Sequence, residues 1–300
     1  MISLLLALSV VTIDPNVGTA GFDFLHITPT AREAAMAGAA TGSGDGAMSF
    51  WFSPAHLTAS SSPQAHLGYC NYIAGIHLGS LAYSQPLGPG RGVGLGIVYL
   101  NSGRMKRTDE QGNELGTFGV SYADVNISGA LEPIPKLSAG VALQGLYGSI
   151  DTFYTIGLAG NLGLTYELPL TGMTAGLAAT NLGFQLRPFQ TERDPMPMDF
   201  AIGLGYRPNP SLNLALDLHK SLDNRIGVRA GIEGWVAELL VLRVGYNTLG
   251  SDLQSGAGDD ILAGITTGLG VRYRNYQLDY CFVPMLQLGL AHRISLSFAL

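Results

Sequence analysis

From about Ser62 to the C-terminus, apolar residues alternate with small or polar residues in one segment after another. Gly, Pro, Asn or Asp residues separate these segments. Successive side chains of a strand point to opposite faces, so each segment would have one apolar face and one polar face. Alternation of this kind is the sequence signature of a transmembrane β-barrel. It predicts about fourteen strands, near residues 63–72, 75–86, 91–105, 117–132, 136–150, 153–168, 172–186, 196–208, 211–221, 225–237, 239–250, 261–274, 276–285 and 287–299.

The amino-acid composition also favours a transmembrane β-barrel. Charged residues make up 13% of the chain, about half the share that is usual for a soluble domain. The longest apolar run, residues 2–13, is too short for a spanning helix, which needs about 20 residues. A closed barrel is the other structure that crosses a bilayer with its backbone satisfied. We therefore expect an all-β, transmembrane antiparallel β-barrel over residues 62–300, in the cell outer membrane and in contact with its lipid.

The N-terminus predicts two further segments. Residues 1–19 have the apolar core of a signal peptide, without a clear cleavage site, so we expect export across the inner membrane. Residues 20–61 do not alternate, and we call them the plug segment. Thr30 and Glu33 fit a capping box for a short helix that Gly38 could end. We expect this partly helical segment in or near the lumen; the alternative is a periplasmic extension.

Charges gather on the predicted inner face of the second half of the barrel. The interpretation that we favour is a structural ladder of cross-strand pairs between these charges. The alternative is a polar conduit for a ligand. Cys70 and Cys281 fall two strands apart, too far for a disulfide, so free thiols are expected. The charged residues are Asp217, Arg229, Glu233, Arg243, Arg272, Asp279 and Arg293.

Tyrosines recur near the predicted strand ends, where membrane proteins place rings with one wet side; the alternative is a rim of core tyrosines in a soluble sandwich. They are Tyr99, Tyr147, Tyr166, Tyr206, Tyr246, Tyr273 and Tyr276. The longer links, 106–116, 188–195 and 251–260, are candidate outer loops. The side chains that we expect to contact a partner are Arg107, Asp109, Glu110, Asn113 and Glu114.

Enzyme and nucleic-acid functions find little support. The six histidines show neither a nucleophile–base arrangement nor metal-ligand spacing, so we expect no catalytic residue, metal or cofactor. A net charge of -6 and the lack of basic runs argue against nucleic acid. The sequence does not indicate an oligomeric state.

Two motifs near the N-terminus resemble those of a known family. The stretch from Gly21-Phe22-Asp23-Phe24-Leu25 to Ala39, with Arg32, Glu33 and Gly38, is similar to the N-terminal signature of the PorV/PorQ family of outer-membrane barrels. Trp51-Phe52-Ser53-Pro54-Ala55-His56-Leu57 resembles a second element, from which Ser53 and His56 depart. The resemblance implies a fourteen-stranded barrel related to the long-chain fatty-acid transporter fold. It also implies a part in type IX protein secretion.

Two functions therefore compete. The first is an accessory of type IX-like secretion that binds exported proteins or secretion-pore subunits. The alternative is a diffusion channel for small hydrophobic molecules. A channel should show a lateral opening or a kinked strand, and the prolines of Pro133-Ile134-Pro135 and Pro195-Met196-Pro197 could disturb strand pairing, because proline cannot donate to the ladder. Both could equally be turns.

Overall fold

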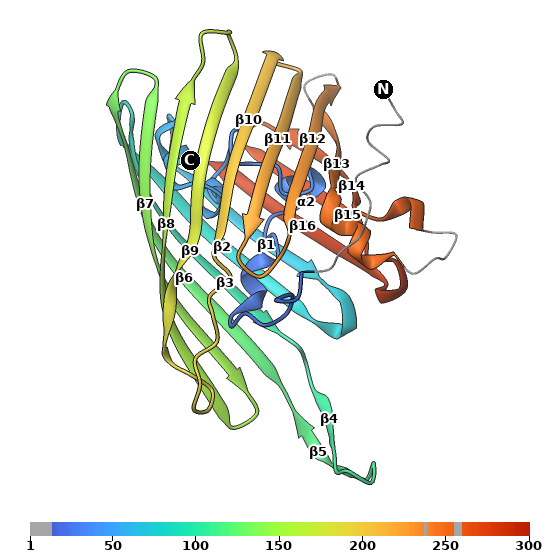
Figure 1. The fold of residues 1–300 in the computed structure, drawn as a ribbon. Helices are drawn as coiled ribbons and strands as arrows, with labels where there is room; N and C mark the ends of the chain where they lie inside the picture. The colour runs from blue at the N-terminus through green and yellow to red at the C-terminus, as the bar shows by residue number, and fades with distance from the viewer. Residues whose placement is uncertain (1–13, 237–238, 255–259) are drawn as a thin grey trace.

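The computed structural model describes residues 14–236, 239–254 and 260–300, so most of the expected signal peptide lies outside the described residues. Fourteen antiparallel strands form a closed barrel, as predicted, and β1 pairs with β16 to close it (Figure 1). The barrel strands are β1 (Gln64–Asn71), β2 (His77–Gly88), β3 (Arg91–Asn101), β6 (Val120–Ile134), β7 (Leu137–Ile150), β8 (Phe153–Glu167), β9 (Met173–Arg187), β10 (Asp199–Asn209), β11 (Leu212–Ser221), β12 (Ile226–Val236), β13 (Leu240–Asn247), β14 (Ile265–Tyr273), β15 (Tyr276–Pro284) and β16 (Leu290–Ala299).

Several details of the strand prediction were wrong. The strand expected over residues 239–250 ends at Asn247, because Thr248–Leu253 form the short helix η6. Residues 106–116 were expected to be a loop, but β4 (Met105–Thr108) and β5 (Glu114–Phe118) form a separate hairpin there. Ile261 was assigned to a strand and lies in the short helix η7 (Asp260–Leu262). Leu288 likewise lies in η8 (Leu286–Leu288), where Leu286 and Gly289 have positive φ. Both short helices continue the apolar alternation of the neighbouring strand, which explains the misassignment.

The connections differ in length between the two ends of the barrel. Links 102–119, 188–198 and 248–264 all lie at one end, which we call the loop end. Links 89–90, 135–136, 210–211 and 274–275 lie at the other, the turn end, where the prolines of Pro133-Ile134-Pro135 fall at a turn. The β4–β5 hairpin extends far from the barrel at the loop end (Figure 1). The three links that were predicted as candidate outer loops therefore lie at the same end of the barrel.

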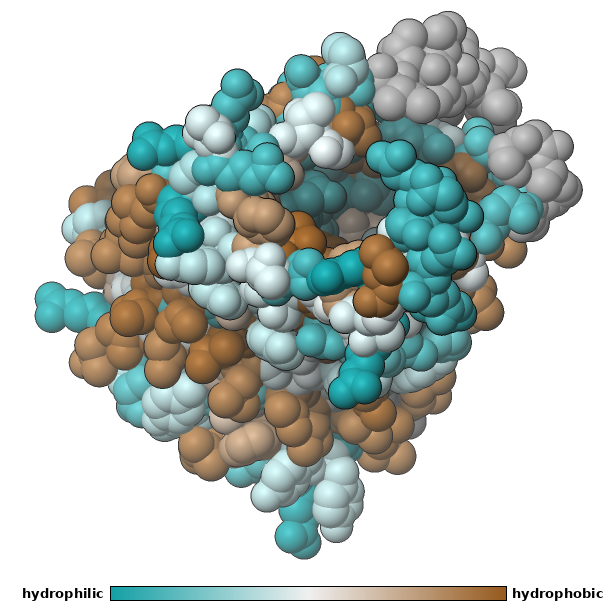
Figure 2. Space-filling view, turned by 90° about the horizontal axis from the view of Figure 1, so that it is seen from below, coloured by the Kyte–Doolittle hydropathy of each residue, from teal (hydrophilic) through white to brown (hydrophobic). Residues whose placement is uncertain are grey.

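The two faces of the wall differ as the alternation predicts. In β11, Leu216 and Leu218 are about half exposed on the outer face, whereas Asp217 between them is buried. The seven tyrosines named above lie on the outer face near the strand ends, three toward the loop end and four toward the turn end. Figure 2 views the loop end, with hydrophobic residues on the flanks and hydrophilic residues around a hollow mouth. Among the described residues, no helix is long and apolar enough to cross a membrane.

The plug segment lies inside the barrel, where most of its residues are buried (Figure 1). It contains α2 (Ala31–Ala35) and the short helices η2 (Asp23–His26), η3 (Ser49–Trp51) and η4 (Pro54–Thr58). It begins near the loop end, where the Gly21 amide donates to the Pro195 carbonyl at 2.9 Å. It ends at the turn end, where β1 starts. The segment therefore passes through the lumen along its length.

Candidate functional site in the plugged lumen

The helix of the plug segment starts where the capping box predicted, but the capping bonds differ. Thr30 is the N-cap of α2, yet its hydroxyl makes no bond to the helix backbone. It donates instead to the Glu33 carboxylate, which also accepts from Arg32 Nη1 at 2.9 Å. Ala37 and Gly38, both with positive φ, follow the helix, and the Gly38 amide donates to the Glu33 carbonyl at 2.8 Å. Contacts of the charged side chains Arg32 and Glu33 therefore help to hold α2 in place.

One ion network joins this helix to the barrel wall. Arg32 donates to both carboxylate oxygens of Glu233 on β12, at 2.9 Å each. Arg243 on β13 donates to Glu233 at 2.6 Å and to Asp279 on β15 at 2.6 Å. All four side chains are largely buried. The structure thus brings together three residues of the predicted ladder and adds Arg32, which sequence reasoning had placed only in the family signature.

The other ladder residues do not pair with one another within 4.0 Å in the described part of the chain. Asp217 accepts the amides of Ala40 and Thr41 at 2.9 Å, although it lies opposite Arg229 in the ladder. Arg293 donates to the Thr28 carbonyl at 3.0 Å. The remaining two lie beside other groups: the Arg229 chain packs near Gly38, and Arg272 stacks on Trp235 and binds Gln277. Charged side chains of the wall, such as Asp217 and Arg293, therefore form hydrogen bonds with backbone groups of the plug segment. These backbone groups are not paired in a β-sheet and need such partners because they are buried.

Glycines on the wall let the plug backbone lie directly against the strands. A Cβ at Gly140 on β7 would lie 2.4 Å from the Pro54 carbonyl carbon. One at Gly92 on β3 would lie 2.3 Å from the Leu57 carbonyl oxygen. No real Cβ approaches backbone atoms so closely. These glycines, unremarkable in the sequence, therefore decide how tightly the plug segment is held.

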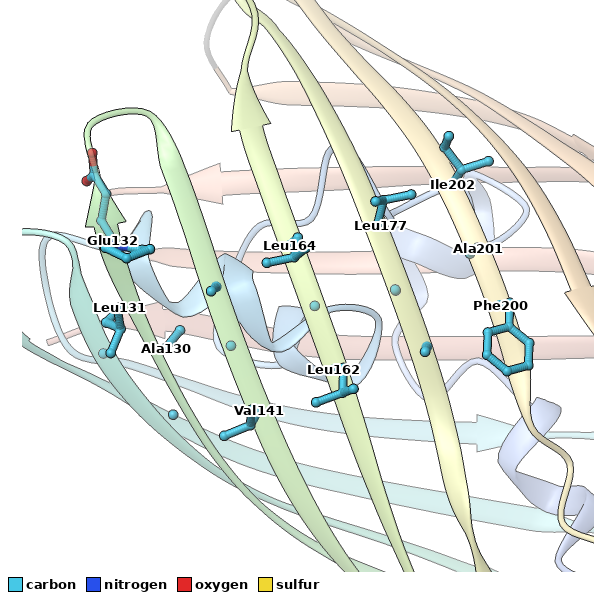
Figure 3. A pocket seen from close by; sticks show the side chains of 18 of the residues that line it. Ala130, Leu131, Glu132, Val141, Leu162, Leu164, Leu177, Phe200, Ala201 and Ile202 are labelled. Atoms are coloured by element: carbon cyan, nitrogen blue, oxygen red, sulfur yellow. The ribbon is translucent and has the colours of Figure 1, made fainter.

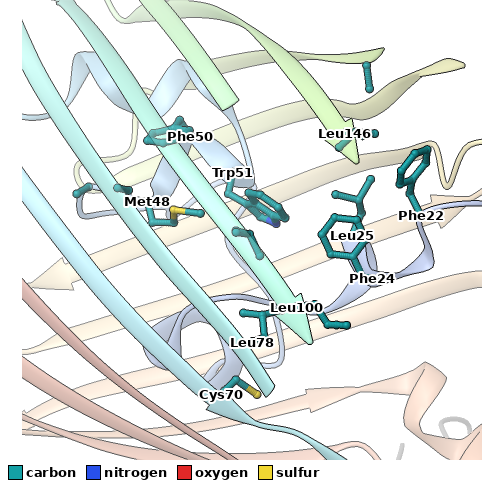
Figure 4. Packing of buried hydrophobic residues seen from close by; sticks show 14 of the residues in the cluster. Phe22, Phe24, Leu25, Met48, Phe50, Trp51, Cys70, Leu78, Leu100 and Leu146 are labelled. Atoms are coloured by element: carbon teal, nitrogen blue, oxygen red, sulfur yellow. The ribbon is translucent and has the colours of Figure 1, made fainter. Parts of the chain in front are cut away.

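A hydrophobic cluster fills one side of the lumen (Figure 4). The plug segment contributes most of its aromatic rings, and β1, β2, β3, β7 and β8 contribute smaller side chains. The cluster extends from Phe22, near Gly157 of β8, to Phe50, near Gly94 of β3, and so follows the barrel toward the turn end. Its large members are Phe22, Phe24, Leu25, Met48, Phe50, Trp51, Leu57, Leu78, Val98, Leu100, Leu146 and Met196. Buried polar groups border it, among them Gln144, which donates to Asp124 at 3.0 Å.

The wall beside this cluster has a gap in its strand pairing. β9 runs to Arg187 and pairs with β8 over that length, but its pairing with β10 stops at Thr180 opposite Asp199. Asn181, with φ 59°, marks the bulge at that point, and its amide donates to Asn161 Oδ1 at 2.8 Å. Within the described part of the chain, residues 182–187 then have no strand partner on the β10 side, over a length of about 20 Å.

Residues 188–198 cover this gap as an irregular segment between β9 and β10 (Figure 1). Among the described residues, no backbone hydrogen bond joins 182–186 to it; side chains do so instead. Gln185 and Asp194 make two hydrogen bonds, and Asn181 Nδ2 donates to the Pro197 carbonyl at 3.1 Å. Met196, between two prolines, is buried in the hydrophobic cluster. Pro195 and Pro197 thus lie where the pairing between β9 and β10 is lost, whereas Pro133 lies at a bulge next to the β6–β7 turn.

A charged contact holds the start of the plug segment at the loop end. His26 Nε2 lies 3.1 Å from Asp223 Oδ2, in the β11–β12 link, and 3.7 Å from Asp23. These three side chains could also approach one metal ion, which the sequence did not predict. Burial alone would lower the pKa of His26, but the hydrogen bond and charge of Asp223 outweigh it and raise that pKa above 6.5. Burial would raise the pKa of Asp223, yet His26 and the Ser221 hydroxyl lower it to about 2.

This contact predicts a pH-dependent hold on the plug segment. Because the pKa of His26 is raised, the contact contributes fully below pH 6.5 and is lost as pH rises through that raised pKa. In acid it persists until Asp223 is protonated, near pH 2. The pair is partly exposed, so its contribution to the free energy that holds the plug segment is about 1 kcal/mol or less. A spin label at Val17→Cys should become more mobile between pH 5.5 and 8.5, and His26→Gln should abolish that change. Equal mobility at both pH values in the parent protein would contradict the prediction.

The remaining predicted residues lie in the lumen, in the wall and on the β4–β5 hairpin. Trp51 belongs to the hydrophobic cluster, and Pro54 begins η4 against Gly140. Cys70 and Cys281 are buried free thiols, as expected. The candidate partner residues all lie on the β4–β5 hairpin or its tip, where Arg107 pairs with Asp151 of the β7–β8 link. Asp109 accepts the Asn113 amide at 2.8 Å, Lys106 pairs with Glu114, and Glu110 is exposed.

Comparisons with known proteins identify the fold. No family model and no curated protein matches the sequence. The structure resembles the toluene transporter TodX of Pseudomonas putida, with a TM-score of 0.61 and 14% identity over 88% of this chain and 95% of that one. It resembles the toluene transporter TbuX of Ralstonia pickettii, with a TM-score of 0.62 and 14% identity over 93% and 98%. For a Pseudomonas aeruginosa FadL homologue the values are 0.61 and 12%, over 91% and 99%.

The chain is therefore a fourteen-stranded β-barrel with the fold of the FadL-type outer-membrane channels. This likeness confirms the predicted relation to the fatty-acid transporter fold. It does not show the PorV/PorQ family that the sequence motifs resemble.

Proposed function

We propose that this barrel is an outer-membrane diffusion channel for small hydrophobic molecules, with its loop end toward the cell exterior. Short periplasmic turns and longer outer loops are usual for such barrels, which supports the orientation. The observation that carries the function is the contact between the hydrophobic cluster and the gap. Met196 belongs to the cluster and also to the segment that covers the gap between β9 and β10.

The chemistry of this route suits an apolar solute. A molecule that enters at the loop end would meet Phe22 and Phe24, then Met196, and would leave between β9 and β10 into the lipid. An unpaired strand edge is tolerated at membrane depth only where protein covers it. Residues 188–198 cover this edge and are held there by a few hydrogen bonds that involve side chains. These bonds hold the segment less firmly than the backbone hydrogen bonds of a paired strand would. Proteins of similar fold that are described as toluene transporters take solutes of this class.

Closing the gap covalently should stop transport. Gln185→Cys with Asp194→Cys places thiols where two side chains already bond. A short thiol cross-linker should then reduce uptake of labelled toluene to the level of cells without the protein. The matched control is Lys106→Cys with Glu114→Cys, a contacting pair on the hairpin that should leave uptake unchanged. Full uptake after cross-linking at the gap, or equal loss in the control, would overturn the lateral route. Failure of the parent protein to raise toluene uptake would overturn the channel itself.

The structures of similar fold do not support the secretion function that the sequence resemblance implies. None of the similar structures named above is described as a secretion component. The β4–β5 hairpin remains the most projecting surface of the described chain, but no feature of it indicates a particular partner.

A further inference from the structure

One line of paired residues crosses eight neighbouring strands, from β3 to β12. Each member pairs with the next across the ladder, and all face the lumen. Seven of the eight are Gly or Ala: Gly92, Ala130, Gly140, Gly163, Ala178, Ala201, His219 and Gly227. Since barrel strands are tilted, this line runs obliquely from near the turn end on β3 to near the loop end on β12.

A groove of about 1320 Å³ follows the same line on the outer, membrane-facing surface (Figure 3). It is lined by outward-facing aliphatic residues, such as Val141, Leu162 and Leu177, and by small outward-facing residues, such as Ala139 and Ala179. On the lumen side, plug backbone lies against the glycines of the line. The wall is therefore thin here.

The chemistry of the groove favours a lipid chain over a polypeptide. The residues of the line are paired in the ladders of the sheet, so they offer no free edge to another strand. An acyl chain needs no hydrogen bonds, and the groove lies among the exposed leucines that face lipid. Charged side chains line it near its ends: Arg91 and Glu132 toward the turn end, Lys220 toward the loop end.

The turn end of the groove also offers a place for a phosphate. Arg91 is exposed beside the groove. Within the described residues, its guanidinium has no carboxylate within 4.0 Å. The nearby Glu132 accepts the Lys136 amide at 2.7 Å and so takes part in the β6–β7 turn. Lys220, at the other end, already lies 3.4 Å from Asp14. Arg91 is thus the cation best placed to meet an anionic headgroup.

We propose that this groove binds one acyl chain of an outer-membrane phospholipid, with the lipid phosphate at Arg91. The site lies on the outside of the barrel and does not depend on transport through the lumen. It would retain one lipid after the remaining annular lipids are removed.

The test uses the full protein in mild detergent with added phosphatidylglycerol, read by native mass spectrometry. The parent protein should retain one lipid. Ala179→Trp fills the groove and should weaken retention about tenfold, as expected when about two methylenes lose their contact. The control, Ala230→Trp, places the same ring on the outer face of β12 beside Leu216 and Tyr246, away from the groove, and should retain the lipid.

Arg91→Gln tests the headgroup contact and should abolish the preference for phosphatidylglycerol over phosphatidylcholine. Circular dichroism and the gel shift on heating check that each variant is folded. Unchanged retention in Ala179→Trp would overturn the site. Equal loss in Ala230→Trp would do the same, because it would indicate a general annulus. Uptake of toluene is not part of this readout, so the two proposals fail separately.

Discussion

Arg243→Ala is expected to be the most destabilising single substitution in the barrel wall, at about 3–5 kcal/mol of the free energy of unfolding. The Arg243 side chain is fully buried between Glu233 and Asp279. Removing it leaves two buried carboxylates with one fewer cation, and the cost of an unpaired buried charge exceeds that of a lost surface contact. Urea unfolding in lipid vesicles, followed by tryptophan fluorescence, measures the change.

Arg274→Ala is the matched control for this substitution. Arg274 is exposed at the β14–β15 turn, with its guanidinium 5.4 Å from the Tyr273 ring centre. Its loss should change stability by about 0.5 kcal/mol or less. If Arg243→Ala were as mild as this control, the network that joins α2 to the wall would be unimportant for stability.

Gly140→Val should have the second largest effect, because it displaces the plug segment. A Cβ at this position would lie 2.4 and 2.6 Å from backbone atoms of Pro54 and Ala55. Backbone cannot move aside as a flexible side chain can, so a cost of about 3 kcal/mol is expected. Partial displacement should also open the lumen, which planar-bilayer conductance for small ions would detect.

Gly145→Val on the same strand distinguishes this packing effect from strand propensity. Gly145 faces outward, with open space around its Cβ position. Valine favours strands over glycine, so this variant should be neutral or more stable, without added conductance. Equal destabilisation of both variants would show that the contact with Pro54 is not the cause.

The barrel itself was predictable from the sequence because alternation is a local signal. Each strand shows its outer face as a row of apolar residues, and β11 is an example, with Leu216 and Leu218 outward and Asp217 inward. The misassigned residues, such as Ile261 and Leu288, continue the alternation beyond the strand. The neighbouring sequence contains no signal for the residue at which the strand ends and the short helix begins.

The site was less predictable, because its parts are distant in sequence. Arg32 and Glu233 are 201 residues apart, and their contact depends on the plug segment lying inside the closed barrel. The gap at β9 depends on where the pairing with β10 stops. The two prolines near Met196 indicated only that something there could not donate to a ladder.

The closed barrel and its lipid-facing apolar surface follow from the sequence alone. Period-two patterning, sparse charge and the lack of an apolar run long enough for a spanning helix leave a closed barrel as the structure that can cross a bilayer. The folded barrel was needed to show which inner charges hold the plug segment, which glycines allow it to touch the wall, and where the pairing of β9 with β10 stops. These features arise from contacts between segments, and a periodic pattern within one segment carries no information about them.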